Sequence, residues 1–327
     1  MNRKRKENTM QNSFYLPEGR ILRTHENLNF TSNLQALSRA MHEERILEGL
    51  VTMCDENLNL HVDLHGIEGI IPKEECLLTP NGESPKDIAI ITRVGKPVCF
   101  KVLSIEESGG KPRAILSRRA AQIECRSYYL SSLTPGDIIP ATVTHLDNFG
   151  AFVDVGCGIV SLLSIDCISV SRISHPSDRL ISGQQIEVVV RAIDDGGRIF
   201  VTLKELLGTW QENADEFSAG RTVSGTVRSI ESYGVFVELA PNLAGLAEIK
   251  DTNPLLSDIE IGDGVSVYIK SILPDRMKIK LVIIDVCHTP VPRTPLKYFI
   301  SSEVADKIKV WRYSPLACPR IIESVFD

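Results

Sequence analysis

The sequence lacks the features that mark membrane-spanning, exported, zinc-binding and catalytic chains. No apolar run approaches the roughly 18 residues of a membrane span, and the basic start MNRKRKENTM is followed by polar residues instead of the apolar core of a secretory signal. The eight cysteines form no CxxC pair and no zinc-like spacing. No HExxH, GxSxG or Walker motif occurs, and the histidines form no cluster. We therefore expect a cytoplasmic protein that is not an enzyme, with no metal, no cofactor and no membrane partner, and with reduced thiols mostly in its cores.

Aromatic residues are few, and positive charge is not in excess. Aromatic side chains make up 6% of the chain, and the formal net charge is −6. This balance argues against indiscriminate binding to polyanions, although it leaves room for a local basic or aromatic surface. Hydrophobic residues, at 43%, are numerous enough for ordinary globular cores. The positions of the few aromatic residues therefore carry much of the functional information.

The chain repeats itself. Residues 141–153, ATVTHLDNFGAFV, align without a gap with residues 225–237, GTVRSIESYGVFV, and Phe149 faces Tyr233 in this alignment. Each segment is followed by the same succession of apolar stretches, polar loops and glycine-containing turns, which predicts five short strands per unit. A fainter copy lies at residues 48–72, where Leu58 and His61 stand in place of Phe149 and Phe152. One structural unit is therefore used three times.

The segments between the copies predict short helices. Residues 117–133 and 204–217 are rich in alanine, leucine, glutamate and glutamine, which favour helices. Residues 31–45 place Leu34, Leu37 and Met41 at helical spacing, which predicts an amphipathic helix packed on the first copy. The expected organisation begins with a basic N-terminal segment and helix at residues 1–44 and a degenerate first repeat at residues 45–117. The second and third repeats follow at residues 134–204 and 219–286, and a C-terminal segment of unassigned role occupies residues 287–327.

Five short, curved strands in each unit predict a small closed barrel of the OB type, because closure removes exposed sheet edges. The expected fold is mainly β: tandem five-stranded OB barrels joined by short helical connectors. We expect a glycine bulge at Gly150 and at Gly234 to shift the strand phase. Phe149 and Phe152 then share the outer face, as do Tyr233 and Phe236. Paired rings outside such a barrel favour stacking with the bases of a single-stranded nucleic acid.

Cations close to these rings favour contacts with phosphate groups. The second unit offers Arg198, and the third unit offers Arg228, Lys278 and Lys280. Two further candidates for phosphate contact, Arg172 and His175, lie in the loop SRISHPSDR of the second unit. Each of these side chains also has a structural interpretation, as a solvated charge or as part of a turn.

The strings NFGAFVDVG, RISHPSDR and GRIFVTLKE, together with SYGVFVEL and IGDGVSVYIKSI, resemble the S1 RNA-binding domain. The resemblance covers about residues 45–288 as three tandem copies. It implies an OB fold that binds single-stranded RNA through two aromatic residues, a histidine on the third strand, and an aspartate and an arginine near the last strand. In the second copy these positions hold Phe149, Phe152, Ser164, Asp194 and Arg198, so four match and the histidine is replaced.

The other two copies depart further from the family pattern. In the third copy the aromatic residues Tyr233 and Phe236 and the cation Lys278 remain, but Glu248 replaces the histidine and Pro274 the aspartate. A carboxylate there repels phosphate, which predicts weaker or more selective binding. In the first copy the positions hold Leu58, His61, Pro72, Gly109 and Arg113, and we expect no strong RNA contact.

Two alternatives remain at this stage. The aromatic pairs can pack against a connector helix or another copy, and Asp194 can serve only to set the turn before the last strand. A second function class is a protein-docking adaptor on the ribosome or on an RNA-processing complex. The acidic balance, the eroded first copy and Glu248 favour the adaptor, whereas the aromatic pairs favour RNA binding. Single-stranded RNA is thus the expected partner, with ribosomal or RNA-processing proteins as further ones.

Overall fold

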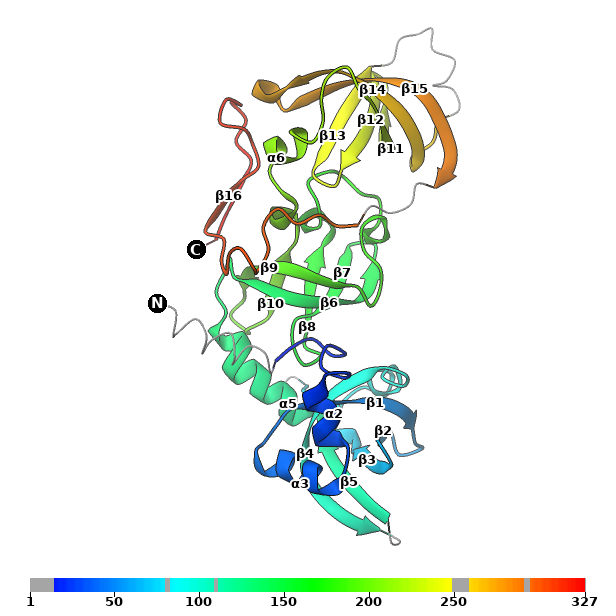
Figure 1. The fold of residues 1–327 in the computed structure, drawn as a ribbon, viewed down its shortest axis with the longest axis vertical. Coiled ribbons are helices and arrows are strands. Elements are labelled where there is room, and N and C mark those ends of the chain that lie inside the picture. The colour runs from blue at the N-terminus through cyan, green and yellow to red at the C-terminus, as the bar shows by residue number, and fades with distance from the viewer. Residues whose placement is uncertain (1–14, 80–82, 109–110, 249–258, 291–294, 327) are drawn as a thin grey trace. The chain divides into compact units, whose positions relative to one another are not determined.

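The computed structural model describes residues 15–79, 83–108, 111–248, 259–290 and 295–326. Three closed five-stranded barrels follow one another along the chain (Figure 1), so the predicted mainly β fold of tandem OB-like barrels is confirmed. The basic residues 3–6 and the turn at Gly109 and Gly110 lie outside the described residues.

Each barrel contains the five strands expected of one repeat. Barrel 1 consists of β1 (Leu47–Cys54), β2 (Leu60–Leu64), β3 (Ile67–Ile71), β4 (Pro97–Ser108) and β5 (Lys111–Ser117). Barrel 2 consists of β6 (Ile138–Asp147), β7 (Gly150–Asp154), β8 (Val160–Ser164), β9 (Gln185–Ile193) and β10 (Ile199–Thr202). Barrel 3 consists of β11 (Thr222–Glu231), β12 (Gly234–Ala240), β13 (Leu243–Glu248), β14 (Asp263–Leu273) and β15 (Lys278–Pro290). In every barrel the third and the last strand pair in parallel, which closes the sheet.

Two short helices precede barrel 1 and pack on its core. These are α2 (His25–Thr31) and α3 (Leu34–His42), whose first turns are capped by the side chains of Thr24 and Asn33. Leu37 is fully buried in the core that the barrel strands share, and Met41 packs against that core. Leu34, by contrast, is exposed. The predicted amphipathic helix is therefore confirmed, except that it begins at Leu34 and turns Leu34 toward solvent. A further helix, α4 (Asp87–Ile91), contributes Ile90 to the same core.

The two predicted helical connectors are present. The first consists of α5 (Arg118–Glu124), a π-helical turn η3 (Cys125–Tyr129) and a 3-10 turn η4 (Leu130–Ser132). The second consists of the 3-10 turn η7 (Lys204–Leu207) and α6 (Trp210–Ala214), which begins with a capping box between Thr209 and Glu212. Six of the eight cysteines are buried, as the sequence predicted.

The chain divides into two compact units. Unit 1 contains residues 1–133 with the short segments 140–142 and 154–160, and therefore holds all of barrel 1. Unit 2 contains residues 134–139, 143–153 and 161–327, which include most of barrel 2, all of barrel 3 and the C-terminal segment.

A buried ion pair organises unit 1. Arg118 at the start of α5 donates two hydrogen bonds to Glu18, at 2.6 and 3.0 Å, and both side chains are almost fully buried. The backbone N–H of Glu18 in turn donates to Asp154 at 2.8 Å. Burial by itself would raise the pKa of Glu18, but the Arg118 guanidinium holds this pKa below its usual value. The segment around Glu18 is thereby held between barrel 1 and the residues of unit 1 that follow β7.

A second buried carboxylate, Glu48 on β1, lies close to the same segment. Its oxygens accept hydrogen bonds from the backbone N–H groups of Gly19 at 3.0 Å and Ile21 at 3.2 Å. Burial, together with the negative charge of Glu18, raises the pKa of Glu48 to about 8 in spite of these donors. Glu48 is therefore a group whose protonation state is coupled to the folding of unit 1.

The stability of unit 1 is expected to fall as the pH rises from 6 to 8. A carboxyl group with a folded pKa above its unfolded pKa of about 4.3 contributes most below that unfolded value, and its contribution is lost as the pH rises through the folded pKa. For Glu48 we expect a loss of about 2 kcal/mol between pH 6 and pH 8. Hydrogen exchange of the barrel 1 amides, corrected for intrinsic exchange rates, measures it.

The matched variant for this experiment is Glu48→Gln, which keeps an oxygen acceptor for one of the two backbone donors and does not titrate. The variant should show a flatter dependence of stability on pH over the same range. Glu18 works in the opposite sense, but only as the pH falls below its lowered pKa. Burial raises the pKa of Asp154 to about 7, so Asp154 titrates in this range in both proteins, and the difference between the two slopes reports Glu48. An equal slope in the variant and the native protein would rule out Glu48 as the source.

Within unit 2, charged side chains join barrel 2 to barrel 3. Arg179, in the loop that follows β8, pairs with Glu238 on β12, and both side chains are buried. Arg228 on β11 donates to Glu238 at 2.9 Å and lies 3.3 Å from Asp178. Asn242, in the turn after β12, accepts a hydrogen bond from the Val170 N–H at 2.9 Å. The loop SRISHPSDR is therefore part of the contact between the two barrels.

The C-terminal segment forms a short hairpin that packs on unit 2. Its strands are β16 (Val310–Arg312) and β17 (Glu323–Val325). Trp311 is buried, and the Tyr313 hydroxyl donates to the carbonyl of Asn242 at 2.6 Å. The segment that matches no repeat is therefore a folded part of unit 2.

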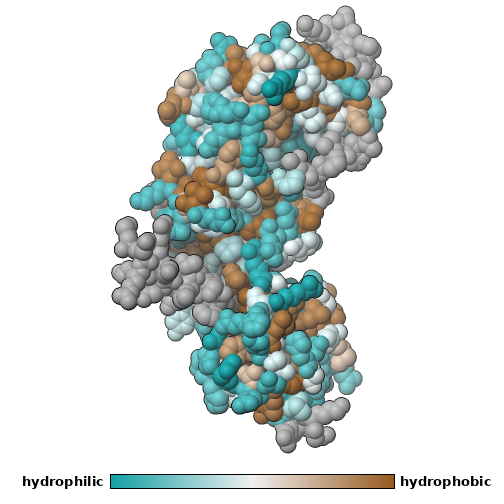
Figure 2. Space-filling model, in the orientation of Figure 1, coloured by the Kyte–Doolittle hydropathy of each residue, from teal (hydrophilic) through white to brown (hydrophobic). Residues whose placement is uncertain are grey.

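The surface carries no continuous apolar belt on the face shown in Figure 2, where hydrophobic residues form separate groups between hydrophilic ones. Among the described residues, no helix is both long enough and apolar enough to cross a membrane. The large apolar side chains that are exposed, among them Phe149 and Tyr233, therefore have to be examined one by one.

Candidate nucleic-acid interface

The two phenylalanines of barrel 2 lie together on its outer face. Phe152 points outward from β7, and Phe149 lies in the tight turn between β6 and β7. Their ring centroids are 5.8 Å apart and the ring planes meet at 89°, which is an edge-to-face pair. Ala151 and Val153 point into the barrel and are fully buried. Phe149 is 52% exposed, so about half of its surface remains open to a ligand.

The predicted glycine bulges are wrong, and the glycines have another role. Gly150 and Gly234 are the first residues of β7 and β12, and the preceding aromatic residue lies in a turn, which is why the two rings share a face. A Cβ at Gly150 would lie 2.5 Å from the carbonyl oxygen of Leu163, and one at Gly234 would lie 2.7 Å from that of Ala247. Glycine is required there because the neighbouring strand approaches closely.

Barrel 3 repeats the same arrangement. The rings of Tyr233 and Phe236 are 6.2 Å apart at 88°, and Tyr233 is 59% exposed. Lys278 is exposed at the start of β15. Lys280, two residues further along β15, lies 3.4 Å from Glu248. Both partners are well exposed, so this ion pair contributes little to stability. It nevertheless gives the Glu248 carboxylate a partner on this face.

Two residues of the barrel 2 face were missed by the sequence analysis. Phe200 on β10 is half-buried and pairs in register with Leu162 on β8. Strand alternation from Arg198 would have indicated it, because residues two apart point to the same face. The imidazole of His145 stacks on Phe152, with centroids 6.2 Å apart and planes at 22°.

The position of His145 could not be predicted by alternation. Simple alternation from the buried Val143 would turn His145 into the barrel. In the unbroken repeat His145 corresponds to Ser229, and a register shift between Val227 and Ser229 brings Ser229 opposite Phe236. The register shift therefore lies within the first strand of the barrel, away from the glycine that opens the second strand.

Asp194 and Arg198 form a unit at the turn before β10. The Asp194 carboxylate accepts hydrogen bonds from the backbone N–H groups of Gly196 and Arg198, at 3.0 and 2.9 Å, and from the Arg198 side chain at 2.8 Å. These hydrogen bonds lower the pKa of Asp194. Asp194 therefore sets the turn, as its structural interpretation required. The side chain of Arg198 is 81% exposed and can still contact a ligand.

The structure corrects the expectation for Arg228. Its side chain is 13% exposed and is held by Glu238 and Asp178, so its charge is already neutralised between barrels 2 and 3. His175 has a structural position too, because its Nδ1 accepts from the backbone N–H of Ser177 at 3.1 Å and caps the 3-10 turn η6 (Pro176–Asp178). Of the remaining cations, Arg172 is exposed to solvent.

The corresponding face of barrel 1 is built differently. Leu58 has a φ of +65° and packs against the core. His61 lies between Asp55 at 3.4 Å and Glu68 at 3.1 Å, and Glu68 also pairs with Arg113 at 3.1 Å. Among the described residues of barrel 1, two carboxylates and no aromatic ring flank His61 on this face. Gly109, the remaining position of the pattern, lies outside the described residues.

Comparison with known proteins agrees with this geometry. Residues 132–204, which contain barrel 2, match the family model of the S1 RNA binding domain. The small ribosomal subunit protein bS1 of Leuconostoc lactis is 32% identical over 237 residues, which are 68% of this chain and 52% of that protein. The bS1 protein of Chlamydia trachomatis is 26% identical over 304 residues, which are 89% of this chain and 52% of that protein.

These matches define the class of protein, which is one with tandem S1-type barrels. The chain is an S1-domain protein similar to the bacterial small ribosomal subunit protein bS1. It spans about half the length of these relatives. The match to a solved structure, a multidomain protein with nucleic acid binding domains from Streptococcus pneumoniae, covers 74% of each chain at 16% identity, with a TM-score of 0.23.

Proposed function

We propose that this chain binds single-stranded RNA on the outer faces of barrels 2 and 3, without catalysing a reaction, and acts in translation or RNA metabolism in the cytoplasm. The observation that carries the proposal is the exposed edge-to-face aromatic pair at the same position of both barrels. Such pairs offer π-faces to successive bases, and each stacked base contributes about 1–3 kcal/mol. The S1 family match and the bS1 relatives support RNA binding at the level of the family.

The charges next to the rings complete the proposed site. Arg198 in barrel 2 and Lys278 in barrel 3 lie at the start of the last strand, and Lys280 follows two residues further along β15. There they can neutralise phosphates of a strand stacked on the rings. His145 and Phe200 enlarge the surface of barrel 2. Lys280 of barrel 3 occupies the position that Phe200 has in barrel 2. On the third strand of each barrel, Leu246 pairs in register with Lys280, and Leu162 pairs in register with Phe200.

Binding to a labelled single-stranded RNA is expected to weaken with salt but to persist at physiological ionic strength. Stacking is insensitive to salt, whereas each phosphate contact to a single strand contributes a slope of about −0.7 in log K against log salt. Fluorescence anisotropy at several salt concentrations measures both. Lys278→Ala should reduce the slope by about 0.7, and Lys96→Ala, an exposed lysine of barrel 1, should leave it unchanged.

The alternative function, a protein-docking adaptor on the ribosome or on an RNA-processing complex, gains no support from the comparisons. Its sequence arguments have also weakened, because Glu248 is paired with Lys280. The two functions are separated by a pull-down with and without nuclease. Partners that vanish with the RNA support RNA binding, and partners that survive nuclease treatment, together with no anisotropy change at either salt, would establish the adaptor.

A further inference from the structure

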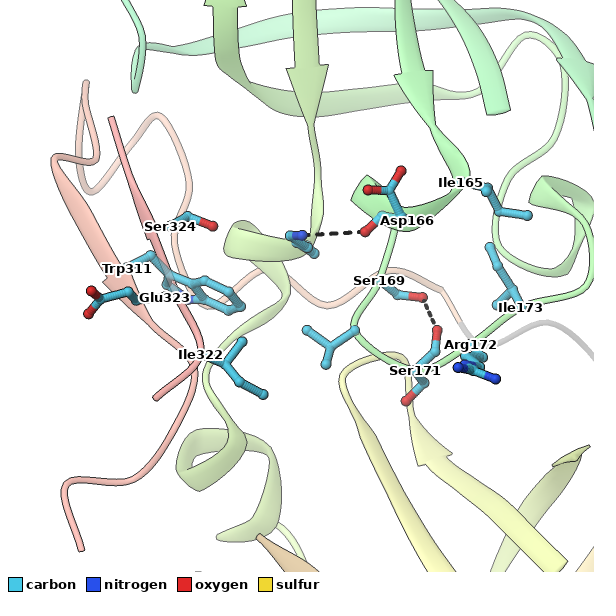
Figure 3. Close-up of a pocket in the computed structure, with 12 residues that line it drawn as sticks. Ile165, Asp166, Ser169, Ser171, Arg172, Ile173, Trp311, Ile322, Glu323 and Ser324 are labelled. Atoms are coloured by element: carbon cyan, nitrogen blue, oxygen red, sulfur yellow. Dashed lines mark hydrogen bonds between the residues drawn. The ribbon is translucent and has the colours of Figure 1, made fainter. Parts of the chain in front are cut away.

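The C-terminal hairpin, which belongs to no repeat, builds one wall of a pocket in unit 2. The pocket has a volume of about 330 Å³. Trp311 and Ile322 line it from the hairpin, and Asp166, Ser169 and Arg172 line it from the loop that follows β8. Figure 3 shows the indole of Trp311 extending from its strand toward the loop that carries Ser169. This volume lies at the lower end of the range for small-ligand sites.

The pocket lies where the proposed RNA-binding face of barrel 2 ends. Strands β8 and β10 are parallel neighbours, with Leu162 opposite Phe200. The chain enters the pocket lining directly after both of them, at Ile165 after β8 and at Lys204 after β10. A strand of RNA that crosses the outer face toward the carboxyl ends of these two strands therefore reaches the pocket.

One residue that lines the pocket, Trp311, carries a buried donor that lacks an acceptor among the described residues. Trp311 is only 4% exposed, and its indole Nε1 has no hydrogen-bond partner among the described residues. Buried polar groups are almost always hydrogen-bonded, because an unpaired one has lost its hydration without replacement. An indole nitrogen can only donate. The acceptor that suits this position is therefore an oxygen or a ring nitrogen from outside the described residues.

The charges around the pocket favour an anionic ligand. The ammonium group of Lys204 lies 3.4 Å from the carbonyl oxygen of Asp166, and no ion pair holds it among the described residues. No ion pair holds Arg172 within the described parts of the chain. The acids of the lining are exposed, and Figure 3 shows the Glu323 carboxylate directed away from the indole. Two available cations, one indole donor and apolar isoleucine side chains match a phosphate joined to a planar base.

We propose that this pocket binds one nucleoside monophosphate unit, supplied by the RNA strand as it leaves the face of barrel 2. The base packs against Trp311 and Ile322, the phosphate lies near Lys204 and Arg172, and the indole N–H donates to an oxygen or ring nitrogen of the nucleotide. The inference rests on the proposed function for its RNA source. A free mononucleotide has the same chemistry, and the experiment separates these two sources.

Trp311 itself provides the signal for the test. The chain has two tryptophans, so Trp210→Phe leaves Trp311 as the single one. We expect an RNA of about 12 nucleotides, a length within the range that one OB fold covers, to change the Trp311 fluorescence with the same Kd as the anisotropy. Adenosine monophosphate is titrated in parallel. A change with the mononucleotide but not with RNA would support the pocket and assign it to free nucleotide.

The cations are tested in the otherwise native chain. Lys204→Ala combined with Arg172→Ala should weaken binding of the same RNA about tenfold, because two phosphate contacts are lost. Lys309→Ala, an exposed lysine of the C-terminal segment outside the pocket lining, is the matched control and should have little effect. The inference would be overturned if the double variant and the Lys309→Ala control lost RNA affinity equally. It would also be overturned if the Trp311 fluorescence responded neither to RNA nor to adenosine monophosphate.

The outcomes also separate this inference from the proposed function. If RNA binds and depends on Phe149 and Phe152 while Trp311 stays silent, RNA binding stands and the pocket inference fails. If RNA does not bind but adenosine monophosphate changes the Trp311 signal, the pocket stands and the proposed function fails. If neither ligand has an effect, both fail.

Discussion

Replacing Phe149 and Phe152 together by alanine is expected to lower the affinity for single-stranded RNA by at least about thirty-fold, since two stacked bases at about 1 kcal/mol or more each are lost. The rings form an exposed edge-to-face pair, and the barrel interior is filled by other residues such as Ala151 and Val153. The fold should therefore survive the change. Fluorescence anisotropy measures the affinity, and circular dichroism verifies the fold.

Two further variants of the chain are compared in the same experiment. Tyr128→Ala removes an aromatic ring that is 72% exposed in the first connector, away from both aromatic pairs, and should leave the affinity unchanged. Replacing Tyr233 and Phe236 by alanine should cost less than the change in barrel 2, because Glu248 pairs with Lys280 on the face of barrel 3 and competes with phosphate for this cation. Affinity that is unchanged after the loss of Phe149 and Phe152, in a folded protein, would contradict the proposed site.

Replacing Arg118 by methionine is expected to destabilise unit 1 by about 3–5 kcal/mol, because the change leaves the Glu18 carboxylate buried without its partner. Arg118 is 2% exposed and Glu18 is 7% exposed, so water cannot replace the lost contacts. Arg118 also donates to the carbonyl of Cys76 at 3.1 Å. Hydrogen exchange of the barrel 1 amides measures the effect within the whole protein, where a single unfolding transition is not assured.

The double variant Glu18→Gln with Arg118→Met distinguishes an uncompensated charge from simple loss of packing. Removing both charges should be less destabilising than removing Arg118 alone, because no isolated carboxylate remains. The matched surface control is Glu68→Gln, which breaks the exposed pair with Arg113 and should cost less than about 1 kcal/mol. The expectation fails if Arg118→Met costs no more than this control.

Much of the fold could be predicted from the sequence because burial follows local periodicity. The gap-free alignment of residues 141–153 with residues 225–237 predicted two equivalent barrels, and the buried Val153 and Val237 confirm which side of each strand faces the core. The shared outer face of the aromatic rings was also predicted, but it was predicted from glycine bulges at Gly150 and Gly234, and that reason was wrong. The turn before each second strand places the two rings on one face. The close approach of the neighbouring strand explains why a glycine follows that turn.

The sequence by itself determined the repeated barrel, the helical connectors and the outward position of the aromatic pairs, since these depend on the spacing of apolar residues within one segment. Only the tertiary structure decided which charges are free. The sequence predicted that Arg228 contacts phosphate, but in the structure Glu238 and Asp178 hold its side chain. Trp311 lines a pocket because the loop after β8 forms the opposite wall. Such partners lie far apart along the chain, and no local pattern specifies which of many possible charges will meet once the barrels are closed and packed.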